Sequence, residues 1–506
     1  MAKQSKKDSL IEFKEKLKEL AHLKSAFSVL HWDKEVYMPA QGNKPRAETL
    51  AYLSGELHQK FLSSKFKKLL EASKDRMAKG ELTPEESAIV REVRREFERE
   101  SKMPLEFVKE LTRVTAEAHW VWAEARKKSD FRIFLPYLKK IVELKRKEAE
   151  FAGFKNSPYD ALLDVYEPCA TAEEISVILE ELKQFLVPFL KKIQTSSRQI
   201  NPQILKGNFS IEKQKEFGKL VLEKMGFSFE AGRLDTSTHP FTIAHHPYDV
   251  RITSRYDKNN LFYSLSSTIH EAGHALYEQG LLAENFGTPL GESVSLGVHE
   301  SQSRVWENIV AKNKPFWRYF YPILQQKFKE PFQKISIDDF YPALNSVQPG
   351  FIRTEADEIT YNLHIILRFE IEKALIEGTI AVENLPLIWN EKVKELLGLE
   401  APNDAMGVLQ DVHWSGGGIG YFPTYTLGNL YSAQFYETAK RDVLNLEDEI
   451  AAGEFGHFRN WLRKKIHIHG KFYRASDLVY NITGEKLNSR YFIEYLKKKY
   501  GEIYEL

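Results

Sequence analysis

Apolar residues recur at every third or fourth position through most of the N-terminal part of the chain. The segments LIEFKEKLKELAHLKSAFSVL, from Leu10, and EISVILEELKQFLVPFLKKI, from Glu174, both have this spacing among charged residues. On an α-helix it places the apolar side chains on one face. The pattern therefore predicts stacked amphipathic helices from Leu10 to about Lys192, with the dense charge runs on solvated faces.

The pattern changes between Gly226 and Tyr256, where β-branched and aromatic residues partly alternate among turn residues. This segment predicts a small antiparallel sheet. Helical spacing then returns, at about residues 264–279, 293–310, 353–377, 385–397 and in several segments beyond 421. We expect a mainly α fold in a single domain of residues 1–506, with a largely helical half (1–225), the small sheet (226–256) and a second helical half (257–506).

Composition adds limits on partners and location. With 506 residues and 42% hydrophobic content, the chain can bury a large core. Its 72 basic and 71 acidic residues leave a formal charge of +1, so nucleic-acid and anionic membrane partners are not expected. The single cysteine, Cys169, excludes an internal disulfide and a cysteine-based zinc cluster. Since no stretch of about 18 uncharged apolar residues occurs, we expect a soluble, cytoplasmic protein.

The clearest chemical pattern is STIHEAGHALYEQG, at Ser267–Gly280. On a helix, His270 and His274 lie one turn apart on one face, so both imidazoles can bind one metal ion. Glu271 lies on the flank of that pair and can reach a water without becoming a ligand. Zinc held by two histidines and a carboxylate keeps a position for water and polarises a peptide carbonyl. The pattern indicates peptide hydrolysis with Glu271 as general base.

A third ligand is needed, because so short a motif also occurs by chance. The segment GESVSLGVHESQSRVWENIV begins another helical pattern downstream and contains Glu300. We predict Glu300 as the third ligand. His299 could ligate instead, but we expect it to support a ligand or to contact the substrate.

Six short motifs follow one another in order along the chain: HPF at His239–Phe241, DVRIT at Asp249–Thr253, HEAGH at His270–His274, HESQ at His299–Gln302, IRTEAD at Ile352–Asp357 and GVLQDVHW at Gly407–Trp414. In this set the chain resembles the thermostable carboxypeptidase Taq family of zinc metallocarboxypeptidases. HWDKEVYMP near the start and SPYDALLDVYEPC at Ser157–Cys169 are similar to the family too. The resemblance thus spans nearly the whole chain, with Cys169 standing where the family has glycine.

The resemblance implies a mostly helical fold with a deep substrate groove, distantly similar to angiotensin-converting enzyme and neurolysin, in a homodimer. It implies one divalent metal per chain, zinc or else cobalt, and release of single residues from peptide C-termini with broad specificity. Carried over residue by residue, His270, His274 and Glu300 are the metal ligands and Glu271 is the general base.

The arginines of two motifs are candidates for binding the substrate. A carboxypeptidase must hold a free terminal carboxylate, which the planar fork of arginine matches with two charge-assisted bonds. Arg353 is the predicted partner, unless it forms a surface ion pair with Glu355 or Asp357. Arg251, held in place by Asp249, is expected either to contact the peptide beside the groove or to stop it from sliding through.

Further candidates come from the remaining motifs. His413 and Tyr425 are predicted to donate hydrogen bonds to the oxyanion formed at the attacked carbonyl, with Tyr421 as the alternative tyrosine. The HPF motif favours His239 as a substrate-binding residue. His239 and His245 could equally be structural histidines.

Two other functions stay open at this point. An oligopeptidase would use the same zinc chemistry to cut internal or dipeptidyl bonds, and a helical binding protein would hold zinc as a structural ion. Structural zinc sites usually fill all four positions with protein ligands, so three ligands beside a glutamate favour an enzyme. The choice between the two peptidases depends on a cation at the closed end of the groove.

Overall fold

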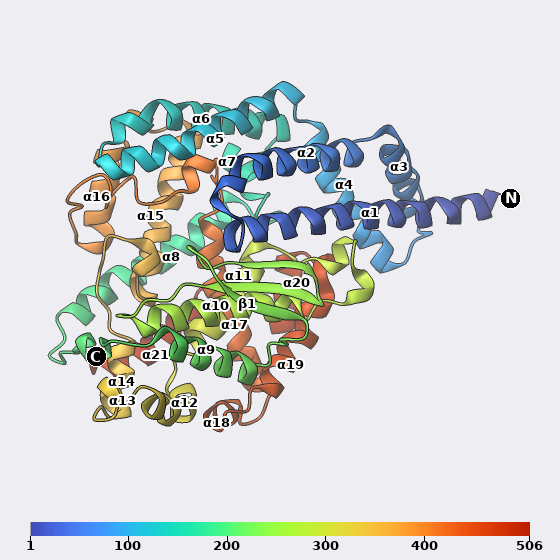
Figure 1. Cartoon of the computed structure of the whole chain (residues 1–506). Helices are drawn as coiled ribbons and strands as arrows, with labels where there is room; N and C mark the ends of the chain where they lie inside the picture. The colour runs from blue at the N-terminus through green and yellow to red at the C-terminus, as the bar shows by residue number, and fades with distance from the viewer. Residues whose placement is uncertain (1) are drawn as a thin grey trace. The chain divides into compact units, whose positions relative to one another are not determined.

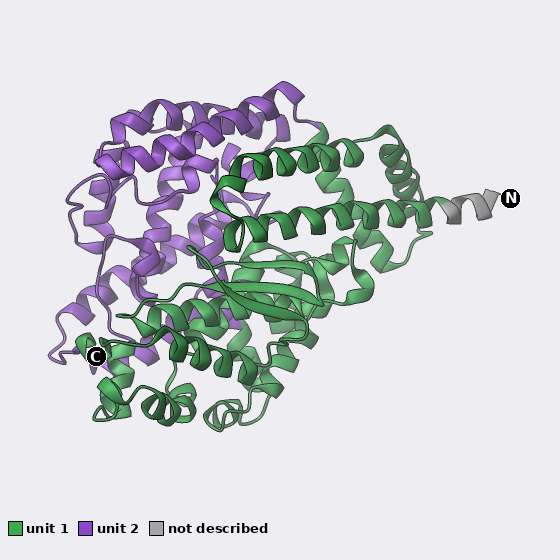
Figure 2. Ribbon diagram, viewed as in Figure 1, with its two compact units in different colours: residues 1–101, 202–344, 435–486 green, residues 102–201, 345–434, 487–506 purple. Residues whose placement is uncertain are grey.

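The computed structural model describes residues 2–506, with side chains from residue 9 onward. Most of the chain is α-helical (Figure 1). It forms two compact units (Figure 2): unit 1 comprises residues 1–101, 202–344 and 435–486, and unit 2 comprises residues 102–201, 345–434 and 487–506. The single domain expected over residues 1–506 stays a prediction.

The helices of unit 1 come from all three of its segments. They are α1 (Ala2–Val36), α2 (Asn43–Phe61), α3 (Ser64–Ala78), α4 (Pro84–Ser101), α9 (Ile211–Met225), α10 (Leu261–Glu278), α11 (Leu296–Arg304), α12 (Lys314–Lys327), α13 (Lys329–Phe332), α14 (Ile337–Leu344), α18 (Leu446–Ala451), α19 (Gly456–Lys465) and α20 (Ala475–Thr483). A π-helical turn, η5 (Val305–Val310), continues α11.

The helices of unit 2 are α5 (Leu105–Lys128), α6 (Phe131–Ala152), α7 (Pro158–Leu163), α8 (Ala172–Gln194), α15 (Glu358–Glu377), α16 (Leu385–Leu397) and α21 (Arg490–Tyr504), and α17 (Pro423–Asp442) passes from unit 2 into unit 1. Two short 3₁₀ turns, η6 (Arg353–Glu355) and η8 (His413–Gly416), also belong to unit 2. The expected helices between residues 10 and 192 are therefore confirmed.

The apolar face of the amphipathic helix α1 packs against neighbouring helices of unit 1. Leu10, Phe13, Leu17 and Leu20 are all under 9% exposed and pack with apolar residues of α3 and α4. Because these positions are three or four residues apart, they share one helix face. The N-terminal core of unit 1 follows directly from the sequence pattern.

The three-stranded sheet of unit 1 lies where the sequence predicts it, in β1 (Gly232–Thr236), β2 (Thr242–His246) and β3 (Asp249–Ser254). Its order is β1-β3-β2, and β3 pairs in parallel with β1 and antiparallel with β2. The sheet is thus mixed, whereas we expected it to be wholly antiparallel. Alternation along a strand specifies its two faces but not its neighbours, and here β3 inserts between its two predecessors.

The sheet is covered by helices of the same unit: α1 contacts β2, and α10 contacts β2 and β3. Residues Val250, Ile252 and Thr253 of the central strand are fully buried. The helix with the HEAGH motif therefore packs against this buried sheet.

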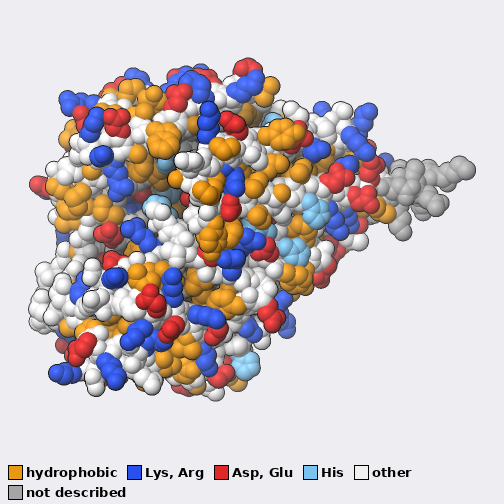
Figure 3. Space-filling view, viewed as in Figure 1, with side chains coloured by type: hydrophobic (Ala, Val, Ile, Leu, Met, Phe, Trp, Pro, Cys, Tyr) orange, Lys and Arg blue, Asp and Glu red, His pale blue; other side chains and the backbone are white. Residues whose placement is uncertain are grey.

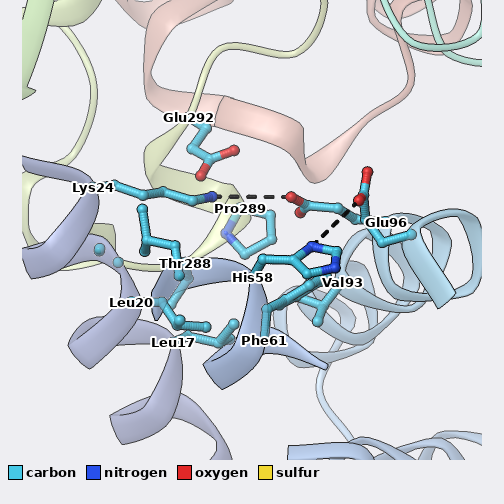
Figure 4. A pocket seen from close by; sticks show the side chains of 14 residues that line it. Leu17, Leu20, Lys24, His58, Phe61, Val93, Glu96, Thr288, Pro289 and Glu292 are labelled. Atoms are coloured by element: carbon cyan, nitrogen blue, oxygen red, sulfur yellow. Dashed lines mark ion pairs between the residues drawn. The ribbon is translucent and has the colours of Figure 1, made fainter. Parts of the chain in front are cut away.

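Unit 1 also contains an open pocket of about 800 Å³ (Figure 4), with lining residues from α1, α2, α4 and the segment 287–292. Leu17, Leu20 and Val93 contribute apolar surface to it. Lys24 forms an ion pair with Glu96 at 4.0 Å, and His58 Nδ1 lies 3.9 Å from Glu100 Oε2.

The surface carries both charge signs. On the face drawn in Figure 3, basic and acidic side chains are interspersed, which matches the formal charge of +1. Among the described helices, none combines the length and apolar character needed to cross a membrane.

Candidate active site

Two helices of unit 1 bring the predicted ligands together. His270 and His274 lie on α10, and Glu300 lies on α11. The close approach of these helices depends on Gly273, where a Cβ would lie only 2.4 Å from the carbonyl oxygen of Gln302. A larger residue in the middle of the HEAGH motif would therefore push α11, and Glu300 with it, away from the two histidines.

The distances within this group fit one metal ion. Glu300 Oε2 lies 3.4 Å from His274 Nε2 and 3.8 Å from His270 Nε2. The three candidate ligand atoms lie within 4.8 Å of one another. Ligands about 2 Å from a tetrahedral ion are separated by about 3.3 Å, close to these distances. The donor set of two imidazoles and a carboxylate suits a divalent metal.

Two further residues, which the sequence reasoning missed, support these predicted ligands. Glu307 Oε2 lies 2.8 Å from His270 Nδ1, an arrangement that leaves Nε2 to face Glu300. Arg304 donates to Glu300 Oε1 at 2.7 Å and to Glu307 Oε2 at 3.2 Å. The spacing of Glu300, Arg304 and Glu307, four and then three residues, was the available signal.

The same contacts govern protonation in the group. Burial disfavours charge on Glu300 and Glu307, but Arg304 and the neighbouring histidines outweigh it, so both carboxyl pKa values lie well below the usual range. Burial lowers the pKa of His274 to about 3, so its imidazole is neutral at pH 7, the form that binds metal.

Glu271, the predicted base, is 7% exposed. Thr242 Oγ1, from β2, lies 2.6 Å from its Oε2 and 2.9 Å from its carbonyl oxygen. Burial raises the pKa of Glu271 above the usual value. Thr242 directly follows the HPF motif, and the sequence reasoning missed it because the contact links a strand to a helix.

The other candidates in unit 1 differ in their surroundings. His299 stacks on His274, with ring centroids 4.4 Å apart, and its Nε2 lies 2.9 Å from Glu278 Oε1. Arg251 donates twice to Asp249, at 2.8 Å each, and its guanidinium carbon lies 4.3 Å from the ring centre of Trp32. His299 is therefore placed to support a predicted ligand, and Asp249 holds Arg251 as expected.

His239 and His245, the two histidines that could be structural, differ in their burial. His239 is exposed. His245 is 7% exposed, and neither of its ring nitrogens has a hydrogen-bond partner among the described residues. Burial lowers its pKa to about 4, so it is neutral at pH 7.

Unit 2 contains the second group of candidates, beginning with Arg353 in η6. The helix expected over residues 353–377 begins at Glu358, because Asp357 caps it by accepting hydrogen bonds from the backbone N–H groups of Ile359 and Thr360. Arg353 is 5% exposed and donates to Asp411 Oδ1 from Nε at 3.1 Å and from Nη2 at 2.8 Å. Its ion pair is thus formed with Asp411 and not with Glu355 or Asp357.

A second arginine shares the same carboxylate. Arg368, on α15, is fully buried and donates to Asp411 Oδ2 at 2.6 Å and to Gln410 Oε1 at 2.8 Å. Two buried guanidinium groups therefore share the one carboxylate to which both of them bond. Burial disfavours charge on Asp411, but the two arginines keep its pKa well below the usual range.

His413 and the tyrosines lie beside Arg353. His413 Nε2 lies 3.3 Å from the Tyr425 hydroxyl, and its ring centre lies 5.4 Å from that of Tyr421. The guanidinium carbon of Arg353 is 5.1 Å from the ring centre of Tyr425. Burial lowers the pKa of His413 to about 4, so the ring is neutral at pH 7. The structure thus brings together all four unit 2 candidates: Arg353, His413, Tyr421 and Tyr425.

The helical fold, with two histidines, a carboxylate and a buried glutamate on adjacent helices, defines the class as a metallopeptidase. The chain belongs to the family described as carboxypeptidase Taq (M32) metallopeptidase, whose sequence model matches residues 12–500. The resemblance stated from the motifs is therefore confirmed.

Individual relatives agree over nearly their full length. The chain is 42% identical over 505 residues to thermostable carboxypeptidase 1 of Thermus thermophilus and 39% identical over 495 residues to carboxypeptidase 1 of Bacillus subtilis, with 98% of each chain covered in both cases. The crystal structure of an M32 carboxypeptidase from Deinococcus radiodurans R1 matches with a TM-score of 0.96 at 37% identity, covering 99% of this chain and all of that one. This chain is a metal-dependent carboxypeptidase, a peptide hydrolase.

Proposed function

We propose that the enzyme releases single amino acids from the free C-termini of peptides, with broad specificity, using one metal ion held by His270, His274 and Glu300. Zinc is the proposed ion, with cobalt as the alternative, because zinc favours imidazole and carboxylate ligands in tetrahedral geometry. A divalent ion in this place would supply the Lewis acidity that polarises the peptide carbonyl and acidifies water.

The residues of the chain have separate parts in this proposal. Glu271 takes the proton of the attacking water and later passes it to the leaving amine, while the hydroxyl of Thr242 orients its carboxylate. His413 and Tyr425 donate to the oxyanion, with Tyr421 as the alternative donor. The neutral His413 ring carries one N–H and Tyr425 one O–H, so while His413 Nε2 and the Tyr425 hydroxyl bond to each other, only one of the two is free to donate. Both donate when the oxyanion takes the place of that mutual bond.

The observation that favours a carboxypeptidase over an oligopeptidase is the buried excess positive charge of Arg353 and Arg368 around Asp411. A buried charge without a partner is costly, and a substrate carboxylate would compensate it. Three bonds, two to Asp411 and one to the Tyr361 hydroxyl, engage three of the five N–H donors of Arg353. The proposal therefore assigns the substrate carboxylate to Arg353.

Three unit 1 residues complete the substrate-binding proposal. Arg251, oriented by Asp249 and Trp32, contacts the peptide main chain, and the exposed His239 contacts the substrate near the HPF motif. His299 acts from behind His274 as a supporting residue.

The test compares two peptides of the same sequence, one with a free C-terminus and one amidated. Amidation removes the charge that Arg353 is proposed to bind, a loss of roughly 2–5 kcal/mol for a buried charged partner. We expect stepwise release of amino acids from the free acid, detected by mass spectrometry, and almost none from the amide. Arg353→Ala should slow hydrolysis of the free acid and narrow the difference between the two substrates. Cleavage of both peptides at the same internal bond with similar rates would establish an oligopeptidase.

We also propose a cytoplasmic homodimer. The exposed, single Cys169 is consistent with a reducing compartment, and the dimer rests on the family resemblance. Sedimentation equilibrium should give about twice the chain mass of 58.7 kDa, and a mass of one chain at micromolar concentration would refute the dimer.

A further inference from the structure

A buried carboxylate of unit 2, outside the six motifs, makes three hydrogen bonds that the proposed mechanism has not used. Glu372 lies on α15 and is fully buried. Its Oε1 accepts from the indole N–H of Trp414 at 2.8 Å. Its Oε2 accepts from the Tyr159 hydroxyl at 2.8 Å and from the backbone N–H of Gly420 at 2.9 Å. A carboxylate accepts about four hydrogen bonds, so this one is nearly saturated.

Two of these donors belong to the segment that carries the proposed oxyanion donors. Trp414 is the neighbour of His413, and Gly420 is the neighbour of Tyr421. The seven residues from 414 to 420 include η8 after its first residue, His413, and the turn that leads to α17 and Tyr425. Glu372 therefore holds the segment at both of its ends.

The backbone conformation and close packing of Gly420 restrict the conformation of the turn. Its φ is +91°, and a Cβ there would lie 2.8 Å from the backbone carbon of Leu162 on α7. Glycine is thus required by both the conformation and the close contact. The backbone N–H of Gly420 is directed to Glu372 while its other side rests on α7.

The same helix also holds the residues just before this segment. Arg368 lies one turn before Glu372 on α15 and bonds to Gln410 and Asp411. Residues 410–420 are therefore attached to one helix at four points, through one basic and one acidic side chain, and the attached stretch includes His413.

We propose that Glu372 is a positioning residue for catalysis, which sets the places of His413 and Tyr425 by holding Trp414 and Gly420. The proposal rests on the oxyanion role proposed above for these two residues. Glu372 itself touches neither substrate nor metal ligand in this account.

The substitution Glu372→Gln replaces one hydrogen-bond acceptor, a carboxylate oxygen, by an NH₂ donor at nearly constant side-chain size. An indole N–H and a backbone N–H can only donate. Whichever way the new amide is turned, its NH₂ group faces either Trp414 or Gly420, so one end of the segment loses its partner. Glu358→Gln is the matched control, since Glu358 lies on the same helix, is 4% exposed, and accepts from Tyr495, Tyr500 and Lys499, away from this segment.

The experiment measures three properties of the metal-loaded enzyme, well below the unfolding temperature of each variant. For Glu372→Gln we expect kcat on the free-acid peptide to fall about 10- to 100-fold, as small misplacements of catalytic groups do, with KM within about threefold of the parent. Hydrogen exchange followed by mass spectrometry should be faster in residues 413–425. Metal content should stay at the parental level. Glu358→Gln should lower the unfolding temperature but leave kcat and the exchange of residues 413–425 unchanged.

Tyr159→Phe tests the same inference if Glu372→Gln does not fold. It removes one donor and leaves the carboxylate, so we expect a fall in kcat of about two- to fivefold in the same direction. Parental kcat in the folded Glu372→Gln variant, or an equal loss in Glu358→Gln, would overturn the positioning role.

His413→Ala serves as the separate check on the oxyanion role. If it keeps parental kcat while residues 413–425 exchange faster in Glu372→Gln, the mechanism fails and Glu372 only stabilises the fold. If His413→Ala loses activity but Glu372→Gln changes neither exchange nor kcat, the inference about Glu372 fails alone.

Discussion

The two candidate clusters are both buried and charged, but their charge balance is opposite. In unit 1, the two carboxylates of Glu300 and Glu307 pair with the single guanidinium of Arg304, beside two histidines. In unit 2, Arg353 and Arg368 meet Asp411, which leaves one net positive charge. Since a buried charge is costly without compensation, the first cluster suits a cation and the second an anion. The sign of the imbalance agrees with the proposed partners, a metal ion for the first cluster and a substrate carboxylate for the second.

The largest expected effect comes from removing the negative charge of unit 1. Glu300→Ala takes away a predicted ligand and leaves Glu307 and Arg304 balanced, so metal should be lost on dialysis against a weak chelator, and activity with it. Metal content by atomic emission is the measurement. Arg353→Ala should keep its metal, because that residue belongs to the other cluster. If Glu300→Ala retains one equivalent as tightly as the parent, the third ligand lies elsewhere.

Glu271→Gln should separate chemistry from metal binding within the same cluster. The amide has nearly the same shape but cannot accept the proton, so kcat should fall at least about 100-fold with full metal occupancy. Turnover and metal content are measured on the same preparation. Near-parental turnover at full occupancy would remove Glu271 from the mechanism.

Glu307→Gln tests whether the contact between Glu307 and His270 Nδ1 strengthens metal binding. Loss of a carboxylate partner from a ligating histidine typically weakens metal binding about 10- to 100-fold. Competition with a chromogenic chelator gives the dissociation constant, with Glu278→Gln, at the partner of His299, as a comparison. An unchanged dissociation constant for the metal would mean that Glu300, held by Arg304, maintains the metal affinity without Glu307.

The smallest expected effect concerns Glu372, which lies four residues after Arg368 of the positive cluster. Burial raises the pKa of Glu372 to about 7, opposed by Gly420, Trp414, Tyr159 and Arg368. An acid whose pKa is higher in the folded state contributes stability below its unfolded pKa, near 4.5, that is lost as pH rises towards 7. The melting temperature of the parent, relative to that of Glu372→Gln, should therefore fall by a few degrees between pH 4.5 and 7. A constant difference across this range would show that the carboxylate is already ionised at pH 4.5.

The sequence by itself determined those features that depend on neighbours along the chain. The helical spacing around Leu10, Phe13 and Leu17 required only one helix face, and the four-residue spacing of His270 and His274 required only one helical turn. The ordered motifs identified the family. The helices and the family are confirmed because periodicity and motif order are local properties of the sequence, while Glu300 as the third ligand stays a prediction.

The tertiary structure alone decided the partners that come from distant segments. Asp411 lies 58 residues from Arg353, and Tyr159 lies 213 residues from Glu372. Thr242 reaches Glu271 only because β2 packs on α10, and β3 joined β1 in parallel although strand alternation is the same for either direction. The packing of distant segments determined which buried carboxylate bonds to the arginines and which one bonds to the turn at Gly420. No local spacing along the chain encodes these pairings.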